Sequence, residues 1–588
     1  MTRRRLLASL VSTPVGGSNT TAATVAAMAK DYWEWVLREN PAQRIKLGLR
    51  IENLPDISPE KSQSEAGIAA EFRRRLARIN ASGLTDEDWL TTELMSYQTQ
   101  LVIDHARFHW LRSLVTPYAS PIPVVNQVYR SYQFTNAADL DGYVSLLDQY
   151  GAFINSIREH LRRQAANGIL LPKAEIALVR PFLSSYIKPA GQSIFRVDPQ
   201  RLVKLGSGTQ SFADRVARII TRQVNPRLQQ LVDSLDGEYF ARAPDSVGLS
   251  QIPGGEAYYR HLVKVHTSLD VTPEQVHRIG LDVVQETSEL MRQTRSKLRF
   301  SGMPEEFNTF LKTAPKFFPR SPEEIGGRLT YFVSRIAPQL PKMFRRLPRA
   351  PYDVRRLDPS LEGAQTFGHY QTPTATEPKG IYYYNGSDLK SRTLLDAAVL
   401  IYHELIPGHH LQMNLQSENA SLPEFRRYGS FEAYPTGPNL FAGAYTEGWA
   451  CYATLLADEL GMYADPYDYY GYLTMNMFYS VRLVVDTGMN CLGWSRQRAT
   501  DYMRAHLLQT DPQIATETLR YSTDLPAQAL AYRMGARKIA ELRDRAKQVR
   551  SVRFDIRDFH QWILGSGAMP LSILEKHLDH HSLAVAAR

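Results

Sequence analysis

The sequence predicts a mainly α-helical protein built from about two lobes, with one small β-element. The chain has 588 residues, well beyond the roughly 250–300 residues at which a single hydrophobic core stops growing. Long stretches place apolar residues three and four positions apart between charged ones, which is the period of an amphipathic helix. One short run combines β-prone residues with flanking turn residues, and it accounts for the β-element.

The helical pattern begins at Asp31. It is clearest in three stretches with apolar residues at helical spacing, Ala69–Asn80, Leu140–Asn167 and Phe212–Leu235. A further helix start is encoded at Thr272, which can cap the helix, while Pro273 suits the first turn and Gln275 can complete a capping box. We expect that helix to run to about Lys297.

The segment Leu340–Thr376 is rich in proline and arginine and has no sustained period, which is typical of an irregular connection. We therefore place a boundary near residue 350, between an N-terminal helical lobe of residues 31–350 and a C-terminal lobe of residues 351–588. Just beyond the boundary, Gly380–Gly386 is the best strand candidate, because isoleucine and tyrosine form its centre and turn residues bracket it.

The N-terminus is ambiguous. Residues 1–30 contain no acidic residue and carry Arg3, Arg4 and Arg5 ahead of a short apolar stretch, Leu6–Val15. This composition fits a weak targeting leader or a flexible tail before the first helix, so we expect a soluble protein that is either cytoplasmic or exported. No run approaches the ~18 apolar residues of a membrane-spanning helix, and we expect no integral membrane segment. The sequence does not fix the oligomeric state.

Composition and charge exclude several function classes. The 69 Lys and Arg against 60 Asp and Glu give a net charge of +9, a mild bias for this length that does not indicate a nucleic-acid partner. Cys451 and Cys491 are too few for a disulfide framework or a cysteine-rich metal site. Gly206–Gly208 is a lone glycine turn without a nucleotide-binding signature. Any metal site must therefore use histidine and carboxylate.

The segment Leu394–Gln412 carries the strongest chemical signal. An almost wholly apolar helix here presents four polar side chains, His403, Glu404, His409 and His410. Polar groups in an apolar helix cost several kcal/mol unless they find partners, and a metal ion satisfies several at once. In the standard zincin helix, H-E-x-x-H, two histidines four residues apart bind zinc and the glutamate acts on the attacking water.

This segment departs from the standard spacing, because Pro407 occupies the position of the second histidine. In a regular helix His409 lies about 240° round from His403, whereas His410 returns to within about 20° but about 10.5 Å further along the axis. Pro407 has no N–H for the fourth preceding carbonyl, and Gly408 is a permissive joint. We therefore expect a bulge that carries His409 back to the ligand position, with His410 as the alternative ligand.

A third ligand is predicted on a separate helix. Glu447 opens another apolar helix, where its charge again needs a partner. His403, His409 and Glu447 would leave one position of a zinc ion open for water, and Glu404 would act as general base. We predict one Zn²⁺ per chain. A core network in which histidine and glutamate pair with one another is the structural alternative.

These motifs resemble the domain-of-unknown-function family 885, whose signature is H-E-x-x-P-G-H-H followed downstream by E-G-W/A. The resemblance runs from Asp31 nearly to the C-terminus and includes Tyr32–Trp35, Leu54–Ser58, Gly255–Tyr259 and Leu525–Tyr532. It implies a two-lobed helical metallopeptidase-like body with a deep cleft, similar in architecture to thimet oligopeptidase and related gluzincins. The H-E-x-x-G-H helix of dipeptidyl peptidase three is an analogy with one inserted residue.

Further residues are candidates for contacts with the substrate or transition state. Members of the family commonly carry histidine where this chain has Asn490, which we place in substrate binding. Hydrolysis by zinc needs a donor to the developing oxyanion and a cation or hydrogen bond for a substrate carboxylate, and the predicted catalytic candidates are Arg482, Tyr521 and Tyr532. Tyr479 offers the same chemistry. Each of them alone is more often a packed residue of an amphipathic helix.

We predict a zinc-dependent hydrolase that cleaves a peptide or peptide-like amide bond by metal-activated water, with residues 351–588 as the catalytic lobe. The strand beside the metal helix would bind extended substrate through its backbone, with Tyr382 and Tyr383 as substrate-binding residues. Two alternatives remain open. One is a non-proteolytic metal-dependent hydrolase or lyase that acts on a small amide-containing metabolite, and the other is a metal-free binding protein on the same fold.

Overall fold

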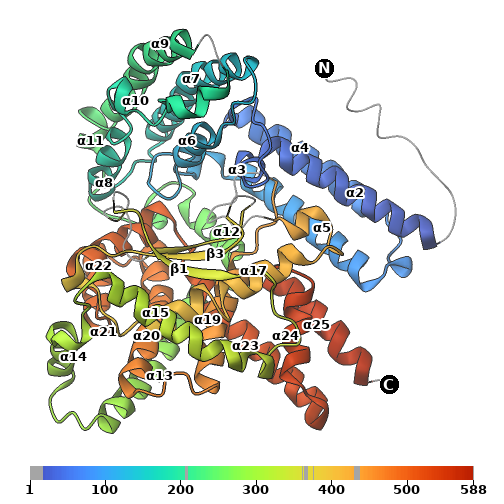
Figure 1. Cartoon of the computed structure of the whole chain (residues 1–588), viewed down its shortest axis with the longest axis vertical. Helices are drawn as coiled ribbons and strands as arrows, with labels where there is room; N and C mark the ends of the chain where they lie inside the picture. The colour runs from blue at the N-terminus through green and yellow to red at the C-terminus, as the bar shows by residue number, and fades with distance from the viewer. Residues whose placement is uncertain are drawn as a thin grey trace.

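The computed structural model describes residues 18–205, 209–359, 362, 368–374, 377–429 and 438–586. These residues are mainly helical, with one small three-stranded sheet (Figure 1), so the predicted fold class is confirmed at this level. No helix among them combines the length and the hydropathy that a membrane span requires. The glycine turn at residues 206–208 and the first 17 residues of the predicted leader lie outside the described residues.

The first described helix begins inside the segment predicted as a leader. α2 spans Ser18–Glu39, and its Val25 and Met28 are buried, so the second half of that segment belongs to the folded body. Three helices follow, α3 (Pro41–Lys46), α4 (Pro59–Leu76) and α5 (Asp86–Arg107). The side chains of Ser58 and Thr85 accept backbone N–H groups and cap the starts of α4 and α5.

A second group of helices forms the upper part of the molecule in Figure 1. It comprises α6 (Ile122–Ser131), α7 (Ala138–Ala166), α8 (Lys173–Ser184), α9 (Thr209–Ile219), α10 (Asn225–Asp233) and α11 (Glu238–Arg242). The helix predicted over residues 212–235 is α9 and α10, joined by a π-turn at Ile220–Val224. This group has its own core, in which Tyr129 packs edge-to-face on Tyr143 and Phe195.

The capping box predicted at Thr272 is present. Thr272 Oγ1 accepts the backbone N–H of Gln275 at 3.3 Å, and Gln275 Oε1 accepts the backbone N–H of Thr272 at 2.8 Å. α13 spans Pro273–Lys297 as expected, and α12 (Gly255–Thr267), α14 (Pro304–Thr313) and α15 (Pro322–Ile336) flank it in sequence.

The C-terminal part of the chain contains the remaining described helices, which are α16 (Ala397–Glu404), α17 (His409–Glu418), α18 (Glu424–Arg427), α19 (Gly443–Glu459), α20 (Pro466–Asn490), α21 (Arg496–His506), α22 (Asp511–Leu519), α23 (Leu530–Arg550), α24 (Ile556–Gly565) and α25 (Leu571–Ala586).

The sheet has three strands, β1 (Tyr352–Arg356), β2 (Gly368–Gln371) and β3 (Gly380–Tyr384), in the order β1-β3-β2. β3 is the strand that the sequence predicts; β1 runs parallel to it and β2 antiparallel. β1 and β2 correct the prediction that residues 340–376 are irregular. Both strands are short and polar, so their identity depends on pairing with β3 and not on their own composition.

The two largest hydrophobic cores of the described residues are not separated at residue 350. One belongs to α6 to α11. The other takes side chains from both sides of that position: Phe332 of α15 packs on Tyr402 of α16 with ring centroids 6.0 Å apart, and Tyr32 of α2 packs on Phe425 at 5.3 Å. The proline- and arginine-rich segment Leu340–Thr376 therefore contributes strands to the larger body and does not separate two lobes.

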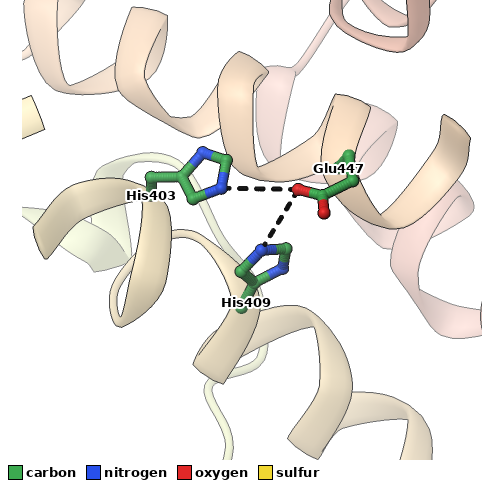
Figure 2. Close-up of side chains that lie close together, drawn as sticks. All are labelled: His403, His409 and Glu447. Carbon is green, nitrogen blue, oxygen red and sulfur yellow. Dashed lines mark ion pairs between the residues drawn. The ribbon is translucent and has the colours of Figure 1, made fainter. Parts of the chain in front are cut away.

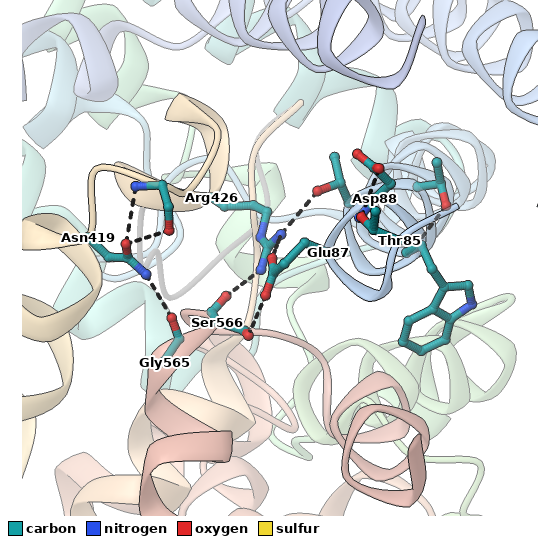
Figure 3. Close-up of polar contacts among 11 residues, drawn as sticks. Thr85, Glu87, Asp88, Asn419, Arg426, Gly565 and Ser566 are labelled. Atoms are coloured by element: carbon teal, nitrogen blue, oxygen red, sulfur yellow. Dashed lines mark hydrogen bonds and ion pairs between the residues drawn. The ribbon is translucent and has the colours of Figure 1, made fainter. Parts of the chain in front are cut away.

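A buried arginine joins distant parts of the larger body (Figure 3). Arg426 of α18 is 1% exposed and donates to Glu87 of α5 at 2.7 Å. Its other donors reach the hydroxyl of Thr91 at 3.0 Å and the carbonyl of Ser566 at 2.6 Å. Ser566 Oγ also donates to Glu87 at 2.8 Å. Burial acts to raise the pKa of Glu87, but Arg426 holds it below its ordinary value. The network therefore fixes α5 against the end of α24.

We expect Arg426→Met to lower the free energy of unfolding by about 2 kcal/mol, because buried oxygens lose their donor while the half-exposed Glu87 can be rehydrated. Since the folded-state pKa of Glu87 is lowered, the contribution of this pair is present at neutral pH and is lost as the pH falls through that pKa. Urea unfolding at neutral pH and at about pH 3 measures both effects. The control is Arg292→Met, which breaks a solvent-exposed pair with Glu289 and should leave the free energy of unfolding close to that of the wild type. Equal losses from the two variants would contradict the assignment.

Candidate metal site

Three helix ends bring the predicted ligands together, as Figure 2 shows. His403 lies in the last turn of α16, His409 begins α17 and Glu447 lies near the start of α19. Glu447 Oε2 is 3.5 Å from Nε2 of each imidazole. One ligand atom from each residue lies within 4.8 Å of the others, and all three residues are buried. This is the arrangement that the sequence predicts for His403, His409 and Glu447.

The spacing of these atoms fits a metal better than a direct hydrogen bond. Zinc bonds of about 2.0–2.2 Å to nitrogen and oxygen place neighbouring ligand atoms of a tetrahedron about 3.3–3.6 Å apart. The 3.5 Å separations match that edge and exceed a good N–H···O distance. Glu447 Oε2 is buried and accepts no hydrogen bond from the described residues. Burial acts to raise the pKa of Glu447, but the two imidazoles hold it well below its ordinary value, so the carboxylate is charged and available to a cation.

The chain between the two histidines is a break between helices and not the predicted bulge within one helix. α16 ends at Glu404 and α17 begins at His409, with a turn between them. Pro407 cannot donate a backbone hydrogen bond, and its carbonyl instead accepts the indole N–H of Trp449 on α19 at 2.9 Å. The two imidazole rings finish 4.8 Å apart at 84°. The break therefore does what the bulge was expected to do, which is to return His409 to the site.

Gly408 is required by the tightness of this turn. A Cβ at position 408 would lie 1.8 Å from the carbonyl oxygen of His403 and 2.6 Å from that of Tyr402. No side chain can be accommodated at these distances, because both neighbours are backbone atoms of α16. The need for glycine arises from this close approach and not from an unusual φ, which is −79°.

His410 is excluded from the ligand group by its hydrogen bonds. Its Nε2 is 3.0 Å from the carbonyl oxygen of Ala350, and its Nδ1 is 3.0 Å from the hydroxyl of Tyr370. Both ring nitrogens are thus engaged on the side of the sheet, and the side chain is fully buried. The group that could hold a metal therefore contains His409, whereas His410 is turned to the sheet.

Glu404 lies beside the ligand group. Its side chain is half-buried, and its carboxylate accepts the backbone N–H of Tyr370 in β2. Burial raises the pKa of Glu404; the charge of Glu447 acts in the same direction, and those of His403 and His409 oppose it. A carboxylate with a raised pKa, next to three convergent ligands, has the properties of a general base.

Comparisons with known proteins identify the family to which the chain belongs. Residues 41–578 match the family described as "Bacterial protein of unknown function (DUF885)". The chain belongs to the DUF885 family. A "putative lipoprotein" from Colwellia psychrerythraea is 25% identical, with a TM-score of 0.86 over 96% of this chain and 100% of that one. A "putative lipoprotein of unknown function" from Shewanella oneidensis is 16% identical, with a TM-score of 0.71 over 94% and 99%. No curated protein matches by sequence. The activity must therefore be argued from the site itself.

A close helix crossing brings Tyr532 of this DUF885 protein to the ligands. A Cβ on Gly448 would lie 2.5 Å from the backbone of Gly535, and one on Gly535 would lie 2.0 Å from the carbonyl oxygen of Ala444. Only glycine permits α19 and α23 to approach so closely. Gly448 directly follows Glu447, and Gly535 lies three residues after Tyr532. The Tyr532 ring consequently stacks on the His403 ring, with centroids 6.3 Å apart at 16°.

The other predicted catalytic residues lie one layer behind Tyr532. The Tyr479 ring lies beside both of these rings, with its centroid 6.0 Å from that of His403 and 5.3 Å from that of Tyr532. The Arg482 guanidinium lies 4.9 Å from the Tyr532 ring centroid and donates to the hydroxyl of Tyr521 at 2.6 Å. Tyr521 is fully buried and donates in turn to Glu517, which also pairs with Arg482 at 3.3 Å. Arg482 and Tyr521 therefore support the tyrosine layer, and Tyr532 faces the ligands.

Asn490 does not fit its predicted role in substrate binding. Its Oδ1 accepts the backbone N–H of Leu249 at 3.0 Å, and its Nδ2 donates to the carbonyls of Asp486 and Tyr521, each at 2.9 Å. The residue is fully buried. Because both ends of its amide are used within the protein, Asn490 joins α20 to its neighbours and has no donor or acceptor turned to a ligand.

Tyr382 and Tyr383 also differ from the prediction. They lie on β3, the central strand, whose two edges are occupied by β1 and β2. Burial raises the pKa of Tyr382 well above its ordinary value, and this side chain is 1% exposed. A strand that is paired on both sides cannot receive a substrate strand. Among the described residues the edge beside Glu404 is β2, which the sequence did not identify.

Cys451 is a neighbour of the site that the sequence analysis missed. Its Sγ lies 3.8 Å from Nδ1 of His403, and its side chain is buried. Glu447 and Cys451 are four residues apart on α19 and so share one face of the helix. This four-residue spacing could have identified Cys451 from the sequence, because it places the thiol on the helix face that carries Glu447.

We expect Gly408→Ala to lower the melting temperature and to move His409 away from His403 and Glu447, because the new methyl group would clash with the carbonyl oxygens of His403 and Tyr402. A zinc ion held by these three side chains should then be lost. Inductively coupled plasma mass spectrometry of the purified variant and its thermal unfolding test this. The control is Gly327→Ala in α15, where a Cβ would meet nothing within 4 Å; it should keep wild-type metal content and gain up to about 1 kcal/mol. Wild-type zinc affinity in Gly408→Ala would contradict the steric argument.

Proposed function

We propose that this DUF885 protein is a zinc-dependent hydrolase that cleaves a peptide or peptide-like amide bond. The observation that carries the proposal is the buried group of His403, His409 and Glu447, with 3.5 Å separations and Glu404 beside it. Two histidines and one glutamate are the donor set of zinc peptidases, which keep one position open for water. The family and the solved neighbours carry no assigned activity, so this chemistry rests on the site.

His403, His409 and Glu447 hold the metal in this proposal. Zinc, when bound, supplies a Lewis acid that polarises the scissile carbonyl and lowers the pKa of water towards ~7. Glu404 accepts the proton of the attacking water and passes it to the leaving amine, a role for which a raised carboxyl pKa is suited. Its hydrogen bond from Tyr370 fixes the carboxylate on the side of β2.

Tyr532 is the proposed donor to the developing oxyanion. Its ring stacks on His403, and its phenol is half-buried next to the ligand group. Burial raises the pKa of Tyr532, so the hydroxyl keeps its proton at neutral pH and can donate it in a hydrogen bond. The guanidinium of Arg482 behind the ring holds this layer in place.

The edge strand β2 favours an extended substrate. Among the described residues it is paired with β3 on one side only, and the backbone of Tyr370 at its centre reaches Glu404. A peptide main chain can add to such an edge by backbone hydrogen bonds, which places its carbonyl groups along the line of the metal ligands. This supports peptides or peptide-like amides as the substrate class.

The first experiment distinguishes the proposed general base, Glu404, from the proposed metal ligands. Purified protein should hold about one zinc per chain, and Glu404→Gln should keep that metal while turnover of a quenched fluorescent peptide library falls by about 10²-fold or more. His403→Ala and Glu447→Ala should lose the metal instead. Chelation followed by zinc addition should abolish and restore hydrolysis. A metal-free preparation with full activity, or near-normal kcat in Glu404→Gln, would sink the proposal.

The second experiment tests the tyrosine. Tyr532→Phe should lower kcat by about 10- to 10³-fold with zinc content unchanged, as expected when one oxyanion donor is removed. Tyr521→Phe is the matched control: it removes a hydroxyl bonded to Arg482 and Glu517 and should affect thermal stability more than kcat. A larger kcat loss in Tyr521→Phe than in Tyr532→Phe would assign the role of oxyanion donor to Tyr521 instead.

A further inference from the structure

The second histidine of the P-G-H-H motif contacts all three strands of the sheet. His410 Nε2 meets the carbonyl of Ala350, two residues before the start of β1, and its ring packs edge-on against Tyr352, the first residue of β1, at 5.2 Å. Its Nδ1 meets Tyr370 of β2 at 3.0 Å. At the start of β3, a Cβ on Gly380 would lie 2.3 Å from the same Nδ1. The imidazole therefore fills the junction where the sheet docks on α17.

The hydrogen bonds of this junction require one form of the ring. The carbonyl of Ala350 can only accept, so Nε2 carries the proton and donates. Nδ1 is then an acceptor, and the hydroxyl of Tyr370 donates to it. Asn414, one turn further along α17, donates to the Tyr370 oxygen at 3.0 Å and also lies 3.2 Å from Nδ1. Every polar group of the junction is satisfied when His410 is neutral.

Tyr370 links this junction to the site. Its side chain is held by His410 and Asn414, and its backbone N–H donates to the carboxylate of Glu404. His410 directly follows His409 in α17. Two consecutive histidines of the motif thus point in different directions. The imidazole of His409 faces Glu447, whereas that of His410 contacts the sheet and holds β2 at a fixed position relative to His409.

We propose that His410 is a positioning residue that pins the edge strand β2 to α17, so that the strand holds the Glu404 carboxylate and the substrate backbone in register with the metal ligands. The catalytic part of this inference rests on the proposed hydrolase. The structural part, the anchoring of β2 by a neutral imidazole, does not. A one-ångström displacement of such a support costs up to about 10²-fold in rate, because the reacting groups must be aligned.

A matched control exists elsewhere in the chain. His560 of α24 is buried to the same degree, and its Nδ1 lies 2.8 Å from the carbonyl of Met343 while its Nε2 lies 3.1 Å from the hydroxyl of Tyr452. It therefore makes one backbone and one tyrosine contact, as His410 does, but it touches no strand of the sheet. The two histidines separate a general loss of core stability from a specific release of β2.

The experiment compares His410→Ala, His410→Gln, Tyr370→Phe and His560→Gln in the full-length protein. Hydrogen exchange followed by mass spectrometry reports the backbone of residues 368–374, equilibrium dialysis with zinc reports metal affinity, and peptide hydrolysis reports kcat and KM. We expect His410→Ala and Tyr370→Phe to speed exchange in residues 368–374 by about tenfold or more and to lower kcat/KM by about tenfold or more, with zinc affinity unchanged. His410→Gln, whose amide can donate to Ala350 and accept from Tyr370, should restore most of both. His560→Gln should leave exchange in that segment at the wild-type rate.

Three outcomes would overturn the inference. Wild-type exchange over residues 368–374 in both His410→Ala and Tyr370→Phe would show that β2 does not depend on the anchor. Loss of zinc from Tyr370→Phe, or from His410→Gln, would make this cluster part of the metal site. Equal effects of His410→Gln and His560→Gln on that segment would reduce His410 to a core residue. If the wild-type protein bound no zinc and cleaved no peptide, the proposed function would fail while the exchange result still decided the anchor.

Discussion

A carboxylate buried between two imidazoles is the arrangement around which the C-terminal half of this chain is organised. Removing the charge of Glu447 from water costs several kcal/mol unless cations or polarised donors surround it. His403 and His409 each lie 3.5 Å from Glu447 Oε2, too far for a good hydrogen bond, so a cation shared by the three side chains would meet that requirement. Because three separate helices must supply the three side chains, α16, α17 and α19 are constrained to end or begin at one point.

The surrounding packing follows from that constraint. The turn between α16 and α17 leaves no room for a side chain at Gly408, and the indole of Trp449 ties the turn to α19. On the other side, Gly448 and Gly535 let α23 approach α19 closely enough for Tyr532 to stack on His403. Glycines are thus placed where backbones must nearly touch, and the cost in chain entropy is offset by the fixed geometry of the site.

The sheet is attached to this centre through one turn of α17. His409 faces His403 and Glu447, and the neighbouring His410 faces the strands. β2 has few residues and, in the part of the chain that the structure describes, one strand partner, so its position depends on the side chains that hold it from outside the sheet. On the far side, the Arg426 network fixes α5 to the end of α24, so helices distant in sequence share the body that contains the site.

Sequence alone determined which residues form the candidate site and that the fold is mainly helical. Polar side chains in apolar helices identified His403, Glu404, His409 and Glu447, because such groups need partners wherever the helices lie. The capping box at Thr272 was equally readable, since all its atoms belong to four consecutive residues. Strand β3 was found because isoleucine and tyrosine dominate it.

Tertiary structure decided what depends on contacts between distant segments. Ala350 and Tyr370, neither of which is near the motif in sequence, hold His410 at the sheet and leave His409 beside His403 and Glu447. Asn490 proved to be a core residue because Leu249 and Tyr521 use both ends of its amide. The edge position of β2, and the shared core across residue 350, likewise have no local signal. Local spacing fixes which atoms can meet within one or two helical turns, whereas hydrogen-bond partners from other helices and strands decide which of them face the candidate metal site.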